Sequence, residues 1–312
     1  MKVKIDGSVL KHSPSKEFFF DCMSAHRINH SIDSSNISNL LDEFDEDSVV
    51  TEKLKRLAVI SANQDFHLSI TITQNGCSNT HSISNLNEIL SRKAVIILEN
   101  EFSDAGFLGA VLKAKGKEWL FNLKDISWEI KGTGGCGQIP RAIVSEVKKS
   151  HGILRLFVIH DSDKLFPGSD YSVAQKAIIQ TARNNNVYCH TLLKREIENY
   201  IPDIMISNID VTRARMVRNL DKLSSIQKDY FDYKIGFKKK GGYRKKDDAL
   251  YNGLFESIDD DVYESLKDGF GKDIAEKIFF DGCQINLDVF SKRCANIDKE
   301  FNDICEVIEK IL

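Results

Sequence analysis

Two short apolar runs constrain the fold of this chain more than any other feature. The runs AVIIL (94–98) and LRLFVIH (154–160) are continuous and rich in β-branched residues. Such runs are typical of strands that are buried on both faces of a parallel sheet. Further extended segments and helical segments alternate with them: 126–131 and 187–191, and 104–115, 140–149 and 171–184. This alternation predicts an α/β, Rossmann-like parallel sheet.

The pattern differs on either side of this alternation. Residues 1–90 are rich in Ser and Asn, and only 66–73 alternates like a half-buried strand, which predicts an N-terminal α+β region. Residues 206–312 are charged and helical, and their last helix, at about 288–311, has one apolar face. That face either packs on its own domain or enters the groove of a partner. We therefore expect three units: 1–90, 91–205 and 206–312.

Composition narrows the setting of the protein. The chain has 312 residues, a net charge of −3 and no apolar stretch near the roughly 20 residues that cross a bilayer. Its first residues lack the pattern of a signal peptide. Seven scattered cysteines without a CxxC pair indicate reduced thiols rather than a zinc site or a disulfide framework. We expect a cytoplasmic protein with no membrane partner.

Carboxylates follow both buried strands. Glu99 comes directly after the first strand and Asp104 opens the next helix, while Asp161 and Asp163 follow the second strand as a D-x-D. Ligands bind beyond the carboxyl ends of the strands in such sheets. Oxygen ligands suit Mg²⁺, and carboxylates held this close would repel one another without a cation. The pattern predicts a Mg²⁺ or Mn²⁺ site.

Two segments have one functional and one structural interpretation each. The loop GTGGCGQ (132–138) either cradles a phosphate through backbone N–H groups, Gly134 and Gly135 among them, or makes a tight turn that needs glycine. The basic run Lys234–Lys246 (KIGFKKKGGYRKK) either contacts nucleic acid or is a solvated loop. Since the whole chain is slightly acidic, any contact with nucleic acid depends on such a local patch.

The order of these elements resembles the TOPRIM domain shared by topoisomerases, primases and the OLD-family (overcoming lysogenization defect) nucleases. The motifs on which this resemblance rests are VIILENEFSD, then a Gly-Gly turn, and then a strand followed by DSD. KREIENYIP (194–202), DYKIGF (232–237) and LKDGFGKDIAEKIF (266–279) also resemble segments of OLD-like proteins from anti-phage defence systems. The resemblance covers about 94–280 and implies a TOPRIM-like fold for the core.

The resemblance assigns roles residue by residue. It implies that Glu99 is the family's glutamate, and that Asp161 and Asp163 are its metal-binding pair. Asp104 would match the acidic residue that follows the glutamate. The spacing between the two residues is, however, one residue longer here than in the commonest OLD form. The usual Glu-Gly is Glu-Asn in this chain, and Glu101 competes with Glu99 for the invariant position.

The implied reaction is metal-dependent hydrolysis of a phosphodiester. Lys164, or Lys194 and Arg195, would offset charge on the phosphate. Glu198, with Glu196, is a further candidate ligand, or else part of an acidic helix start. Asn199 and Tyr200 are expected to pack and to form hydrogen bonds.

The resemblance implies an endonuclease that serves in anti-phage defence. Its substrate is nucleic acid, with DNA favoured over RNA and the choice between them left open. No Walker motif is present, so ATP sensing would lie in a separate ATPase partner; a homo-oligomer is also left open. Two other interpretations remain. A D-x-D after a strand also serves metal-dependent phosphatases and glycosyltransferases, and a TOPRIM-like core could be a non-catalytic binding or assembly subunit.

Overall fold

A four-stranded parallel sheet forms the centre of the chain. The computed structural model describes residues 1–33, 35, 49–63, 66–280, 285–294 and 296–312. The strand order is β6 (Trp128–Gly132), β5 (Ala94–Leu98), β7 (Leu156–His160) and β8 (Tyr188–Thr191). All neighbouring strands are parallel, with Val95 opposite Leu156. Every residue of β5 and β7 is buried, as the apolar runs predict. The predicted α/β fold with a parallel core is confirmed.

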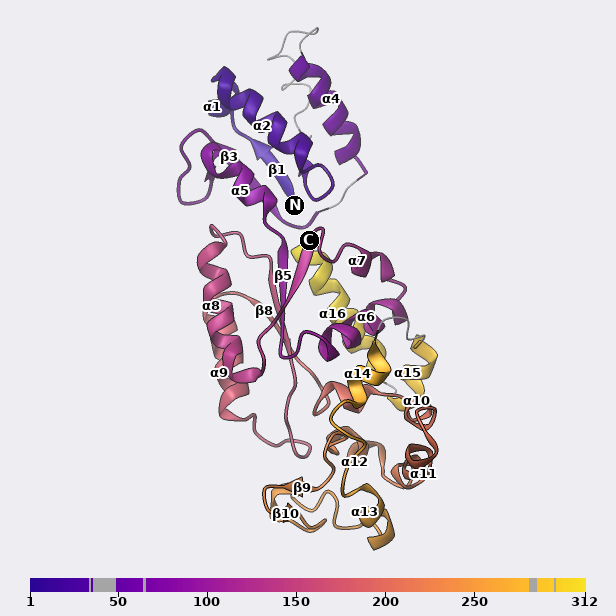
Figure 1. Cartoon of the computed structure of the whole chain (residues 1–312). Helices are drawn as coiled ribbons and strands as arrows, with labels where there is room; N and C mark the ends of the chain where they lie inside the picture. Colours follow the sequence, from indigo (N-terminus) through magenta and orange to yellow (C-terminus); the bar gives the residue numbers. More distant parts are fainter. Residues whose placement is uncertain (34, 36–48, 64–65, 281–284, 295) are drawn as a thin grey trace.

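Helices cover both faces of this sheet (Figure 1). The helices α8 (Ile139–Lys149) and α9 (Val173–Asn184) pack on one face, where Val95, Ile143 and Ile178 share an apolar cluster. The other face carries α6 (Ser103–Ala114) and α16 (Ile297–Ile311). On that side the apolar core is continuous from the sheet into the C-terminal helices. The 206–312 region therefore shares the apolar core on that face of the sheet.

The C-terminal region is helical, as predicted, and most of its helices are short. They are α10 (Asp203–Ser207), α11 (Val211–Leu220), α12 (Ser225–Tyr230), α13 (Asp260–Leu266), α14 (Ile274–Phe279) and α15 (Leu287–Arg293). The expected single helix over 288–311 is two helices, α15 and α16, and the apolar face of α16 is buried within its own chain. A small antiparallel hairpin, β9 (Lys238–Lys239) and β10 (Gly242–Tyr243), lies between α12 and α13.

The N-terminal region contains a second parallel sheet, which the sequence did not reveal. Its order is β2 (Ser31–Ile32), β1 (Lys2–Ile5), β3 (Ser69–Thr73) and β4 (His81–Ser82). The predicted strand at 66–73 is β3. The helices of this region are α1 (Gly7–Leu10), α2 (Ser13–Ala25), α4 (Val49–Ser61) and α5 (Leu86–Ser91). The region has an apolar core of its own.

A helix α7 (Glu118–Asn122) links α6 to β6. Within the described parts of the chain, no helix combines the length and the apolar character that crossing a bilayer requires.

Candidate functional site

A cleft of about 530 Å³ opens at the carboxyl ends of β5 and β7. These neighbouring strands flank the point where the strand order reverses, which is where ligands bind in sheets of this kind. Its lining carries six carboxylates and two ammonium groups: Glu99, Glu101, Asp104, Asp161, Glu198 and Glu276, and Lys234 and Lys272. Four of the five predicted metal ligands therefore line one cleft.

The loop after β6 fixes the backbone of Glu99. The N–H groups of Gly134 and Gly135 donate to the Glu99 carbonyl oxygen at 2.9 and 3.2 Å. Both glycines have positive φ values of 71° and 131°, which side chains other than glycine rarely adopt. Because both N–H groups are already bonded, the structure favours the tight-turn interpretation of this loop, although both glycines line the cleft. Gly132 also packs against Glu101, which lines the same cleft.

The two aspartates of the D-x-D differ in their surroundings. The Asp161 carboxylate lies in the cleft and accepts a hydrogen bond from the Ile197 N–H at 3.1 Å. Asp163 has a left-handed φ of 51°, uncommon for a residue other than glycine, and its carboxylate accepts a hydrogen bond from Gln175. Such strained backbone is found at functional sites more often than elsewhere. Asp163 is exposed and is not part of the cleft lining, but its charge helps to raise the pKa of Glu99.

The segment 194–200 delivers two more carboxylates to the site. The short helix Ile197–Tyr200 begins after Glu196, whose N–H donates to the Asn199 side chain at 3.0 Å. Asn199 donates in turn to two backbone carbonyls of the α12 region, both at 2.8 Å. Glu196 is 6% exposed and Glu198 3%. Both residues open the helix, as the structural interpretation predicts, and Glu198 also lines the cleft, where a role as metal ligand stays a prediction.

The three cations that were expected to contact substrate, Lys164, Lys194 and Arg195, all interact with other side chains of the protein. Lys194 is buried and pairs with Asp229. Arg195 pairs with Asp232 at 2.7 Å. Neither residue is part of the cleft lining. Direct contact with substrate therefore stays a prediction, and in the structure these residues anchor the segment that carries Glu196 and Glu198.

Lys164 also points elsewhere. Its ammonium group lies 4.3 Å from the centre of the Tyr171 ring, and it is absent from the cleft lining. A cation over an aromatic face gains about 0.5–1 kcal/mol where it is exposed. The structure thus gives Lys164 a local packing partner.

Lys234 is the cation that the sequence did not single out. Its ammonium group lies 3.1 Å from a Glu196 oxygen and 3.4 Å from a Glu198 oxygen. Burial alone would lower the pKa of Lys234, but the charges of Glu198 and Glu196 raise it. The backbones of Gly236 and Gly269 touch one another and fix this segment. The sequence signal that could have identified it is the lysine of DYKIGF. That lysine is also the first residue of the basic run Lys234–Lys246, for which a solvated loop was one interpretation.

Four of the cleft carboxylates, those of Glu99, Asp104, Asp161 and Glu198, have raised pKa values and so hold protons more tightly than isolated carboxylates do. Burial raises the pKa of Glu99 to about 7, and the charges of Asp163 and Asp104 add to this. Burial, with the charges of Glu99 and Glu198, raises the pKa of Asp161 well above its usual range. Burial also raises the pKa of Glu198 to about 7. Such a set of desolvated, mutually repelling acids is typical of functional sites.

The donor atoms suit a hard divalent cation. All are carboxylate oxygens, and one oxygen of Glu99 is buried without a hydrogen-bond partner. A cation at that point would relieve both the desolvation and the repulsion of Glu99 and Asp161. Within the ranges that the structure describes, however, no three Asp, Glu, His or Cys side chains are arranged to hold a metal ion. A bound ion would have to draw the carboxylates together.

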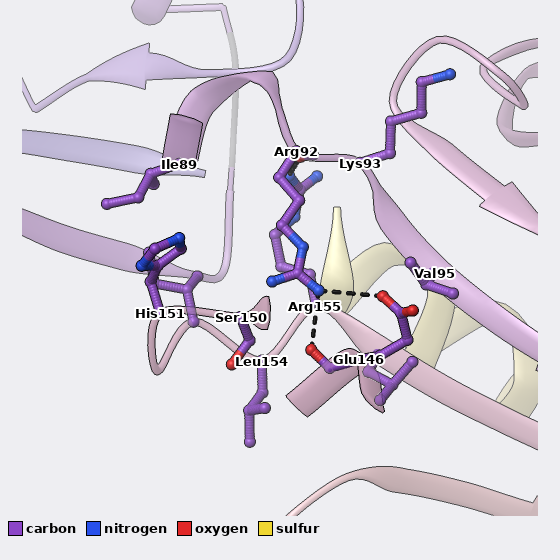
Figure 2. A pocket seen from close by; sticks show the side chains of 11 residues that line it. Ile89, Arg92, Lys93, Val95, Glu146, Ser150, His151, Leu154 and Arg155 are labelled. Atoms are coloured by element: carbon purple, nitrogen blue, oxygen red, sulfur yellow. Dashed lines mark hydrogen bonds and ion pairs between the residues drawn. The ribbon is translucent and has the colours of Figure 1, made fainter. Parts of the chain in front are cut away.

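A second cavity lies at the opposite end of the core strands (Figure 2). There the Arg92 side chain donates to the backbone and the carboxylate of Glu146, at 2.9 and 3.2 Å. The space is about 20 Å³, which is close to the volume that one water molecule needs. It is too small for a substrate.

Comparisons of the chain with protein-family models, with curated proteins and with solved structures found no match.

Proposed function

We propose that this chain is a metal-dependent nuclease that hydrolyses nucleic-acid phosphodiesters in the cleft at the carboxyl ends of β5 and β7. One observation carries the proposal. Glu99, Asp161 and Glu198 come from three separate segments, line one cleft, and all have raised pKa values. Gathering buried acids in this way costs stability, and binding a cation would recover that cost.

Glu99, Asp161 and Glu198 would hold Mg²⁺ or Mn²⁺, with Asp104 and Asp163 adding negative charge around them. Such an ion, when bound, polarises the phosphate and makes water a better nucleophile. Alternatively, Glu99 would stay outside the metal shell as the proton-transfer group, for which its metal-free pKa of about 7 is well matched near neutral pH. Asp104 is held by the Asn100 N–H at 2.9 Å and by the Ser103 hydroxyl at 2.9 Å, which fixes its orientation.

Lys234 would stabilise the negative charge that develops on the phosphate. It lies against the acidic cluster, by which we mean Glu99, Asp161, Glu196 and Glu198. Its pairing with Glu196 and Glu198 keeps it protonated. A preorganised charge in a water-poor site contributes more than the same charge in bulk water. Lys272 lines the same cleft and would contact a neighbouring phosphate.

The TOPRIM and OLD-like resemblance supports the same reaction and adds a setting. We include in the proposal an anti-phage role in the cytoplasm, with a separate ATPase partner. Co-purification of the chain with a nucleotide-hydrolysing protein from its native host would test that part by itself.

The test of the activity uses purified full-length chain with plasmid DNA, single-stranded DNA and total RNA. Each substrate is incubated with Mg²⁺, with Mn²⁺ and with EDTA. We expect metal-dependent cutting that Asp161→Asn abolishes and that Lys234→Ala reduces by at least about 10-fold. Asp33→Asn, a matched control at the N-terminal sheet, should retain it. Cutting that survives Asp161→Asn, or no cutting of any substrate with either metal, contradicts the proposal.

One observation favours the rival interpretation, a non-catalytic assembly subunit. Lys234 already neutralises part of the acidic cluster without a metal. Calorimetry distinguishes the two, because a nuclease site should bind Mn²⁺ and lose that binding in Asp161→Asn. An assembly subunit should bind no Mn²⁺ in the cleft.

A further inference from the structure

The proposed cleft has the wrong charge to attract nucleic acid by itself. Its lining holds six carboxylates against Lys234 and Lys272, and the whole chain has a net charge of −3. Nucleic-acid affinity depends on neutralising phosphates with Lys and Arg. If the cleft acts on a phosphodiester backbone, cations outside the cleft must hold that backbone.

The hairpin formed by β9 and β10 is the concentrated source of such cations. Six basic residues lie between Lys238 and Lys246. Lys239, Lys240 and Lys245 are exposed. No carboxylate among the described residues forms an ion pair with these three, so their charge faces solvent.

The base of this hairpin is held firmly. Phe237 is 1% exposed and packs in a cluster of aromatic rings. Its N–H donates to the Lys267 carbonyl at 2.9 Å, and its carbonyl accepts from the Arg244 N–H at 2.7 Å. The Tyr263 hydroxyl donates to the Arg244 carbonyl at 2.9 Å. These contacts fix both arms of the hairpin where they leave the core.

The tip of the hairpin, in contrast, has open space around Gly241 and Gly242. A Cβ atom built on Gly241 or Gly242 would meet no atom within 4 Å. Figure 1 shows the hairpin at the end of the molecule opposite the N-terminal region. A firmly held base with a basic, unpacked tip is difficult to explain by folding alone, because the tip adds no buried surface.

The hairpin continues directly from the wall of the cleft. Lys234 lines the cleft, and Phe237 begins the hairpin three residues later. The Lys234 carbonyl accepts from the Gly271 N–H at 3.1 Å, which places Lys272, the other cleft lysine, beside the same strand of chain. The cleft and the hairpin are therefore joined by one short segment, with Lys234 at its cleft end and Lys238, which pairs with Asp268, at its hairpin end.

We propose that the hairpin 238–246 binds the phosphodiester backbone of the nucleic acid that enters the cleft. This proposal rests on the proposed function for its substrate class. Lys239, Lys240 and Lys245 make the contacts with phosphates, and release of their counterions supplies affinity that is independent of sequence. The acidic cleft then receives a strand that is already held outside it.

The test compares two triple charge reversals in the full chain. Lys239→Glu/Lys240→Glu/Lys245→Glu alters the hairpin, and Lys11→Glu/Lys55→Glu/Arg56→Glu alters exposed residues of the N-terminal region. Both change the net charge equally. Binding to duplex DNA, single-stranded DNA and RNA is measured by fluorescence anisotropy in EDTA over a series of salt concentrations. The absence of metal separates binding from cutting.

We expect the hairpin variant to lose at least about 10-fold in affinity at low salt. The slope of log K against log salt for duplex DNA should fall by about 2–3, since each lost phosphate contact contributes about 0.9. The N-terminal variant should keep the wild-type slope. Equal slopes in the two variants, or a wild-type chain that binds polyglutamate as tightly as nucleic acid, overturns the proposal. Binding that follows this pattern in a chain that never cuts would overturn the nuclease alone.

Discussion

The chain contains two four-stranded parallel sheets with the same strand order, and only one of them carries a candidate site. In each sheet the first strand lies beside the second on one side and beside the third on the other. An acidic residue follows that first strand directly in both: Asp6 after β1 and Glu99 after β5. The two carboxylates occupy equivalent topological positions.

Their surroundings differ. Asp6 is partly exposed and accepts a hydrogen bond from the Ser8 N–H at 2.9 Å, and its hydrogen bonds to Ser8 lower its pKa. Burial raises the pKa of Glu99, with the charges of Asp163 and Asp104 adding to the shift. A carboxylate after a parallel strand is therefore a helix cap where solvent and N–H groups satisfy it. It becomes a candidate site where burial and other acids leave it unsatisfied.

The largest expected effect separates these two positions by activity. Glu99→Gln should lower nucleic-acid cleavage by at least about 100-fold, because general acid–base groups contribute about 10²–10⁴-fold and a ligand is lost as well. Asp6→Asn should change it less than about 2-fold. Rates of plasmid nicking in Mg²⁺ and in Mn²⁺ measure both. Equal losses in the two variants would remove the distinction between the sheets.

A distant helix supports the core site, whereas the cap at Asp6 is local. The Glu300 carboxylate on α16 accepts from the Tyr200 hydroxyl at 2.8 Å, from the Leu193 N–H at 2.9 Å and from His190 at 3.0 Å. These groups flank the segment that carries Glu196 and Glu198.

Removing that support should destabilise the fold. Glu300→Gln should reduce the free energy of unfolding by about 2 kcal/mol, since an amide cannot accept all these hydrogen bonds. Urea unfolding measures the change, and Asp303→Asn, on the same helix, is the control. An unchanged midpoint would show that α16 does not support the segment.

Thermal stability at pH 8 should separate the two carboxylates by sign. The folded pKa of Glu99 lies above its unfolded value of about 4.5, so its contribution to stability falls as pH rises from 4.5 through about 7. Without metal, Glu99→Gln should therefore increase the free energy of unfolding by about 1–2 kcal/mol at pH 8.

Removing the carboxylate at the N-terminal sheet should have the opposite effect on the free energy of unfolding. Asp6→Ala should decrease the free energy of unfolding by about 0.5–1 kcal/mol, because it removes a helix cap. Melting curves at pH 5 and pH 8 measure both variants, and the gain in Glu99→Gln should shrink at pH 5. Two shifts of the same sign would contradict the difference in burial.

The smallest effect concerns Lys164. Because its ammonium group lies over Tyr171 and away from the cleft, Lys164→Met should change cleavage less than about 2-fold. Lys234→Met, the same chemical change inside the cleft, should reduce it by at least about 10-fold. Steady-state rates on one DNA substrate compare them, and a larger loss in Lys164→Met would restore it as a substrate contact.

The sequence by itself determined the core strands and their carboxylates. Burial on both faces requires a continuous apolar run, and a parallel sheet brings the ends of β5 and β7 to one edge. Both depend on residues close in sequence, so Glu99 and Asp161 could be predicted to meet. The short strands of the N-terminal sheet gave no such signal, because β2 and β4 have two residues each.

Only the tertiary structure decided which polar groups remain available. Lys194 is paired with Asp229, the N–H groups of Gly134 and Gly135 are bonded to Glu99, and Lys234 enters the acidic cluster from a segment far along the chain. Each assignment depends on a partner tens of residues away. Local patterns show which residue types are present, but packing of the whole chain determines which charges are neutralised and which still face the cleft.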